Sequence, residues 1–131
     1  MSEAKSVRVA VVQAAATPFD RDAAVDKVCE MTEQAAEQGA RLVLFPEAYV
    51  GGYPWGLSFG TVVGGRSEEG RRVWERYWSA AVDVPGPEVA RMSEAAEAAG
   101  VHLCVGVIER DSTYSGGTLF CTLLYIGPDG S

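Results

Sequence analysis

Residues 41–56 read RLVLFPEAYVGGYPWG, and this stretch decides how the chain around it is organised. Residues 41–45 are a short, mostly apolar run that predicts a buried strand, and Pro46 ends it because proline cannot donate to a strand ladder. Glu47 follows directly, at the end of a strand, where sites form in α/β sheets. A lone glutamate is more often a surface carboxylate, but one beside apolar and aromatic neighbours suits a general base.

The segments before this stretch predict a strand and a helix. Residues 7–16 hold a run of β-branched valines that is typical of a strand covered on both faces. Asp20 is a suitable N-cap for a helix over residues 21–38, in which apolar side chains recur at helical spacing. Gly39 suits the position just after the end of that helix. Together with residues 41–45, these segments begin an alternation of strands and helices.

The alternation continues after residues 41–56. The segments that follow the glycine-rich loop are predicted as helices over residues 67–81 and 87–99, strands over residues 101–108 and 119–126, and a hairpin loop over residues 112–117. This order predicts an α/β fold in which helices cover a sheet. The turn at residues 127–130 should lead into another strand, so the sheet is expected to be incomplete.

Two sets of aromatic side chains stand out. Tyr53 and Trp55 lie in the glycine-rich loop after Glu47. They either line a substrate pocket or pin the loop to the core, and the sequence favours neither alternative. A second set forms a stripe on one face of the helix predicted over residues 67–81, and it favours core packing or a subunit contact over a cofactor site. Its aromatic members are Trp74, Tyr77 and Trp78.

Composition and charge exclude several classes of protein. The chain has 131 residues, enough for one domain, and 47% of them are hydrophobic, which is typical of a globular fold. Its formal net charge of −7 argues against nonspecific nucleic-acid binding, which requires clustered Lys and Arg. No apolar run is long enough for a membrane span, and the first residues lack a signal-peptide pattern. A cytoplasmic protein is therefore expected.

The cysteines do not form a recognisable framework. Cys29, Cys104 and Cys121 are odd in number and lack a CxxC spacing, so neither a disulfide scaffold nor a zinc site is expected. Each lies in an apolar helix face or strand, where packing is the ordinary role and burial lowers thiol reactivity. His102 and Cys104 are two residues apart on a predicted strand, which permits a Cys–His pair, but no third group that would orient it is evident.

The segment FPEAYVGGYP, residues 45–54, resembles the signature of the nitrilase branch of the carbon–nitrogen hydrolase superfamily. The resemblance covers essentially residues 7–130. It includes VRVAVVQAA at 7–15, Gly64-Gly65-Arg66, AVDVPGPEV at 81–89, VGVIERD at 105–111 and GTLFCTLLYIGPDG at 117–130. It implies an α-β-β-α sandwich of the nitrilase type, with residues 1–131 as a single, incomplete domain that represents the N-terminal half.

The same resemblance implies a chemistry. Enzymes of this family use a Glu–Lys–Cys triad without a cofactor to convert a small nitrile into a carboxylic acid and ammonia, and Glu47 corresponds to the general base. Neither Lys5 nor Lys27 matches the family's lysine, and no cysteine of this chain matches its nucleophile. The expected partners are therefore a small-molecule nitrile and either further copies of the chain or a chain that supplies the missing half. A noncatalytic assembly module of the same fold and a small-amide amidase remain alternatives.

Overall fold

The computed structural model describes residues 6–62 and 65–131 of the chain. In chain order, the elements are β1 (Val9–Val11), α1 (Arg21–Glu37), β2 (Leu42–Leu44), β3 (Thr61–Val62), β4 (Gly65–Arg66), α2 (Glu68–Ser79), α3 (Pro87–Ala99), β5 (His102–Arg110) and β6 (Leu119–Ile126). Lys5 and Gly64, both named above, lie outside the described residues. The alternation expected from the sequence is confirmed, with β3 and β4 as an additional short antiparallel pair.

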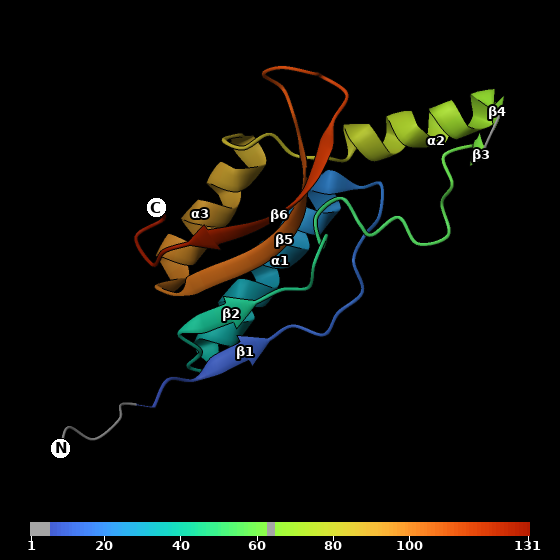
Figure 1. Cartoon of the computed structure of the whole chain (residues 1–131). Coiled ribbons are helices and arrows are strands. Elements are labelled where there is room, and N and C mark those ends of the chain that lie inside the picture. Colours follow the sequence, from blue (N-terminus) through green and yellow to red (C-terminus); the bar gives the residue numbers. More distant parts are fainter. Residues whose placement is uncertain (1–5, 63–64) are drawn as a thin grey trace.

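Four strands form one mixed sheet in the order β1-β2-β5-β6 (Figure 1). β1, β2 and β5 run parallel, with Val43 beside Leu103 in the register of the central pair. β6 returns antiparallel along β5 after the hairpin loop that the sequence predicts. The carboxyl ends of β1, β2 and β5 therefore lie at one end of the sheet, where α/β folds place their sites.

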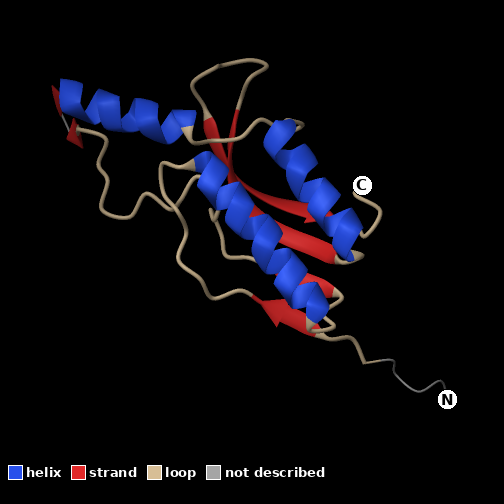
Figure 2. Ribbon diagram, turned by 180° about the vertical axis from the view of Figure 1, so that it is seen from behind, coloured by secondary structure: helices blue, strands red, loops and turns tan. Residues whose placement is uncertain are grey.

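Helices α1 and α3 lie together against one face of the sheet (Figure 2). The core between the helices and the sheet includes the fully buried side chains of Val25, Val28, Val43, Met92, Leu103, Val105 and Val107. The predicted helix ends are confirmed. Asp20 accepts a hydrogen bond from the amide of Ala23 at 3.0 Å, and Gly39 has a φ of 84°, which glycine adopts without strain.

The opposite face of the sheet carries apolar side chains that nothing in the described part of the chain covers. Strand alternation and cross-strand register place Val9, Val11, Leu44, Leu123 and Tyr125 on it, with exposed fractions of 48%, 65%, 38%, 45% and 73%. We call these five residues the open face. Soluble monomers rarely leave an apolar surface of this kind exposed.

The expectation of a first strand over residues 7–16 with both faces covered is wrong. β1 has only three residues, and Val9 and Val11 point to the open face while Ala10 packs against the core. The run of valines favours a strand but does not report how many faces are covered. Val9 and Val11 belong to the open face, which no other described layer covers, as the exposure of Leu44 on the internal strand β2 also shows.

α2 extends away from the sheet and is anchored at its carboxyl end (Figure 1). Tyr77 is buried in a second apolar cluster with Ala48, Ala81 and Ile108. The ring of Trp74 packs edge-on against another aromatic ring, that of Phe59, at 5.1 Å between centroids. The core role expected for part of the aromatic stripe is therefore confirmed. This cluster also joins α2 to the strand end at which Glu47 lies.

Candidate active site at the end of the second strand

Glu47 lies just past the carboxyl end of β2, on a segment whose backbone stays paired with β5. The amide of Phe45 donates to the carbonyl of Cys104 at 2.8 Å, and the amide of Val50 donates to the carbonyl of Gly106 at 3.1 Å. The parallel pairing of β2 with β5 thus continues beyond the strand itself. Glu47 is held between these two backbone hydrogen bonds, which makes its position a property of the sheet.

Gly106 allows this segment to lie directly on β5. A Cβ on Gly106 would stand 2.5 Å from the carbonyl oxygen of Pro46 and 2.6 Å from the amide nitrogen of Ala48. The same Cβ would stand 2.7 Å from the Cα of Glu47. Ala48 itself has a φ of 51°, in the left-handed region that alanine seldom adopts. Close backbone approach and a strained residue next to a carboxylate are features of functional sites.

The side chain of Glu47 is exposed at the end of the sheet and contacts Cys121 of β6. The Cys121 thiol donates to Oε1 of Glu47, with Sγ and Oε1 3.3 Å apart. Burial and the neighbouring carboxylate both raise the pKa of Cys121, so its thiol is protonated at neutral pH. From the sequence, Cys121 was expected to be a packing residue, and its contact with Glu47 was not predicted. The register between β5 and β6, which brings the two residues together, is not visible in the sequence.

The loop after Glu47 is anchored by Tyr77. Its hydroxyl donates to the carbonyl of Gly52 at 3.2 Å, and its ring is buried. Burial, together with the neighbouring Cys121 and Tyr53, raises the pKa of Tyr77 to about 12. Tyr77 is therefore a neutral hydrogen-bond donor at physiological pH. From the sequence, Tyr77 was predicted only as part of an aromatic stripe. Its helical spacing gives no indication of the contact with the loop at Gly52.

Tyr53 and Trp55 extend from this loop into solvent. Their exposed fractions are 61% and 87%, so neither side chain pins the loop to the core of the described chain. Both follow Glu47 along the same glycine-rich segment, and Tyr53 lies near Tyr77. Whether they contact a substrate depends on what covers this end of the sheet, so their role as pocket residues stays a prediction.

The structure places the other candidate residues away from Glu47. Lys27 lies on α1, and its Nζ donates to the carbonyl of Ala15 at 2.7 Å. Cys29 lies on the same helix, where burial raises the pKa of its thiol. The helices cover one face of the sheet (Figures 1 and 2), whereas the strand register places Cys121 on the other face, with Leu123 and Tyr125. Lys27 and Cys29 therefore do not form a triad with Glu47.

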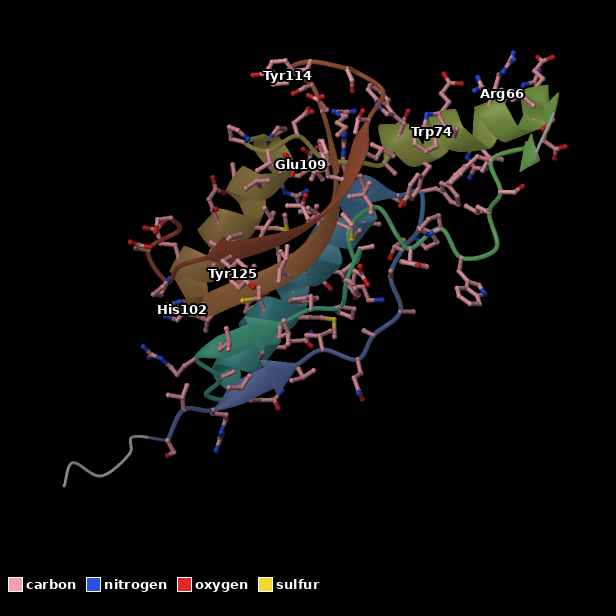
Figure 3. The ribbon with its side chains drawn as sticks, in the orientation of Figure 1. Arg66, Trp74, His102, Glu109, Tyr114 and Tyr125 are labelled. Carbon is pink, nitrogen blue, oxygen red and sulfur yellow. The ribbon has the colours of Figure 1, made fainter. Side chains whose placement is uncertain are left out.

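His102 and Cys104 lie on the same face of β5, as the two-residue spacing predicts, opposite Leu42 and Leu44 of β2. His102 is exposed at the far end of the sheet, near Tyr125 (Figure 3). Burial raises the pKa of the Cys104 thiol, which makes it a poor nucleophile at neutral pH. The pair has the predicted placement but lacks an activated thiol.

The described residues form neither a metal site nor a membrane-spanning helix. Within residues 6–62 and 65–131, no three His, Cys, Asp or Glu side chains lie close enough together to hold a metal ion. None of the helices described is both long enough and apolar enough to span a bilayer. The chemistry offered at the end of the sheet is that of a carboxylate beside a protonated thiol.

The chain is similar in sequence to known carbon-nitrogen hydrolases. The family model for carbon-nitrogen hydrolases matches residues 8–131. An aliphatic nitrilase of Sinorhizobium fredii is 47% identical over 123 residues, which are 94% of this chain and 39% of that protein. Nitrilase 3 of Arabidopsis thaliana is also 47% identical, over 95% of this chain and 35% of its own length. The chain thus spans less than two-fifths of these relatives.

Two solved structures show the same arrangement of strands and helices. An amidase from Nesterenkonia sp. is 22% identical with a TM-score of 0.57, over 95% of this chain and 39% of that one. A CN-hydrolase superfamily protein from Xanthomonas campestris is 25% identical with a TM-score of 0.63, over 95% of this chain and 38% of that one. The predicted fold class, an N-terminal part of a nitrilase-type α-β-β-α sandwich, is confirmed.

Proposed function

This chain belongs to the carbon-nitrogen hydrolase family, and we propose that it forms the Glu47-bearing part of a nitrilase, which converts a small organic nitrile into a carboxylic acid and ammonia. The observation that carries this proposal is the identity of 43–48% to nitrilases along nearly the whole chain. The placement of Glu47 supports it, because a backbone fixed on both sides holds a general base in one position.

In the proposed reaction, Glu47 accepts the proton of a cysteine thiol and the thiolate attacks the nitrile carbon. Glu47 then passes this proton to the nitrile nitrogen, which gives a neutral thioimidate and restores the carboxylate. Water adds to the thioimidate, and ammonia leaves as an acyl-enzyme forms. A second water, deprotonated by Glu47, releases the carboxylic acid and restores the thiol. A lysine stabilises the negative charge that develops on the substrate. No step requires a cofactor.

The nucleophilic cysteine and the lysine are proposed to come from outside residues 1–131. Lys27 is bound to a backbone carbonyl on the helical side of the sheet. The pKa values of the Cys29, Cys104 and Cys121 thiols are all raised, chiefly by burial. The missing groups belong either to further residues of the same polypeptide or to an associated chain, so residues 1–131 form an incomplete domain.

The open face is the proposed contact surface for that missing part. Its five apolar side chains lie on the sheet face opposite α1 and α3, where a second sheet would complete a sandwich. When the second sheet is absent, the chain is expected to self-associate through this face.

A cytoplasmic location is part of the proposal and is tested by fractionating cells that express the tagged protein.

Nitriles are favoured over amides as substrates by the similarity to proteins that are named as nitrilases. The proteins 43–48% identical to this chain are named as nitrilases, some of them bifunctional nitrilase/nitrile hydratases. The sequence identity to the Nesterenkonia amidase is 22%, and this similarity shows the fold alone. A small-amide amidase is therefore the second candidate, and the same assay separates the two.

A chimera tests the proposal directly. The matched segment of the Sinorhizobium fredii nitrilase is replaced by the corresponding residues of this chain, and ammonia release is measured on panels of small nitriles and amides. Release from nitriles is the expected result, and release from amides alone would favour the amidase. A folded chimera inactive on both panels would favour a noncatalytic module. The 131-residue chain is assayed in parallel, and ammonia release by it alone would contradict the assignment of the nucleophile to other residues.

A further inference from the structure

We propose that Cys121 is a positioning residue for Glu47. The Cys121 thiol holds one carboxylate oxygen of Glu47, so that the other oxygen faces the proton that is transferred in the reaction. The proposal rests on the function proposed above only in calling Glu47 the general base. The contact itself is a property of the fold, since Glu47 follows β2, Cys121 lies on β6, and the two residues are 74 positions apart in the chain.

Strand register brings the two side chains together. Cys121 lies opposite Ile108 in the antiparallel pairing of β6 with β5, and Gly106 is two residues away on the same face of β5. The backbone of Glu47 lies directly on Gly106, where a Cβ would stand 2.7 Å from the Cα of Glu47. The carboxylate therefore starts above β5 and reaches the neighbouring strand, where Cys121 contacts it.

The chemistry of the pair assigns the donor. A carboxylate only accepts hydrogen bonds when ionised, whereas a thiol is a weak donor. Burial and the Glu47 charge keep the proton on Cys121 by raising its pKa. The donated hydrogen bond occupies Oε1, so Oε2 is the oxygen left to exchange a proton with the attacking thiol. A thiol that keeps its proton is a weak nucleophile. Cys121 therefore does not compete with the catalytic cysteine for the nitrile carbon.

The other titratable group beside Cys121 does not interfere near neutral pH. Tyr77 has a pKa raised to about 12, in part by the neighbouring Cys121, so it stays neutral near pH 7. Burial is the largest cause of the raised pKa of Cys121, and Glu47 is the charged group that raises it further. The pH dependence of Cys121 reactivity therefore reports the contact directly, with or without enzyme activity.

The first test measures alkylation by iodoacetamide at each cysteine of the 131-residue chain between pH 6 and pH 10, followed by peptide mass spectrometry. In Glu47→Gln, the midpoint of the Cys121 profile is expected to move to lower pH, with a several-fold faster reaction at pH 8. Cys29 and Cys104 serve as internal references and keep their profiles. The matched variant Glu33→Gln removes an exposed carboxylate from α1 and leaves the Cys121 profile unchanged. An unchanged Cys121 profile in Glu47→Gln would overturn the proposal.

The second test uses the nitrilase chimera and separates positioning from packing. Cys121→Ala removes the donor and is expected to lower kcat roughly 2- to 10-fold at unchanged KM, the scale of one hydrogen bond. Cys121→Ser restores a donor and returns most of the rate, whereas Cys29→Ala has no effect on kcat. Equal rates for the Ala and Ser variants would refute the positioning role. Full activity of Glu47→Gln would instead refute the base assignment, while the alkylation result would stand.

Discussion

Gly106 and Glu47 approach so closely that a Cβ on the glycine would stand 2.7 Å from the Cα of the glutamate. Gly106→Ala is therefore expected to push the segment 46–48, which contains Glu47, away from β5. The free energy of unfolding should fall by about 1–3 kcal/mol, the usual cost of overpacking. Urea denaturation measures the change. Gly117→Ala is the matched control, because the nearest atom to its Cβ is 3.9 Å away. Equal stabilities for the two variants would show that the close approach does not persist in solution.

Glu47→Gln in the nitrilase chimera is expected to lower turnover by roughly 10²–10⁴, the scale of a lost general base. The amide occupies the same volume but cannot accept the proton of the attacking thiol. Steady-state ammonia release measures the effect, and circular dichroism verifies that the fold is kept. Glu33→Gln, an exposed carboxylate on α1, should leave turnover unchanged. Turnover close to that of the parent would remove Glu47 from the mechanism.

Trp55→Ala is expected to change the preference of the chimera among nitriles of different width while its melting temperature stays nearly constant. The side chain is 87% exposed in this chain, so its removal leaves the described core intact. If Trp55 lines the pocket of the assembled enzyme, kcat/KM should rise most for wider nitriles, which fit the space that the substitution opens. Relative kcat/KM values across the panel are the measurement. A large fall in melting temperature without a change in preference would make Trp55 a packing residue.

Asp83 and Arg110 form a pH-dependent ion pair between the end of β5 and the segment before α3. Nε and Nη2 of Arg110 donate to the two carboxylate oxygens of Asp83 at 2.8 Å each, which lowers the pKa of Asp83. Because this pKa is lower in the folded chain than in the unfolded one, the pair stabilises the fold at neutral pH. That contribution is lost as the pH falls below about 4.

Asp83→Asn is therefore expected to cost about 1–3 kcal/mol at pH 7, the range for hydrogen bonds to charged groups. The difference from the unsubstituted chain should stay constant near neutral pH and shrink as the pH falls below about 4. Urea midpoints across this range provide the measurement. A difference that stays constant with pH would mean that the substitution acts through packing and not through the charge of Asp83.

The open face predicts that residues 1–131 associate in solution. Tyr125→Lys places a charge on this face and is expected to shift the chain toward monomer in light scattering or sedimentation. Tyr114→Lys is the matched control, because Tyr114 is 93% exposed on the hairpin loop, away from the open face (Figure 3). A monodisperse monomer for the unsubstituted chain would exclude association through this surface.

The helix boundaries were predictable from the sequence because they depend on local chemistry. Asp20 caps α1 through its own side chain, and Gly100 ends α3 with a φ of 62°, so neighbouring residues contain the whole signal. The same is true of the end of β2 at Pro46 and of the position of Glu47 after it. The number of covered faces of β1 was not predictable, since it depends on what lies across the sheet.

The contacts that complete the candidate site were equally hidden, for a different reason. Cys121 meets Glu47 only through the register of β6 on β5, and a shift of one residue would turn its side chain to the other face. The hydrogen bond from Tyr77 to Gly52 depends on how α2 is anchored at its carboxyl end. Spacing within one segment carries no information on either arrangement.

The distance of 74 residues between Glu47 and Cys121 also sets the order in which this end of the sheet is built. A ribosome releases Glu47 long before the hairpin of β5 and β6, so the nascent chain holds β1, α1 and β2 without the strand on which the glutamate rests. Pairing of β2 with β5 closes a long loop and is therefore slow, whereas the hairpin forms from neighbouring residues. During synthesis, the carboxylate stays without its thiol partner until the last strand of this sheet has been made.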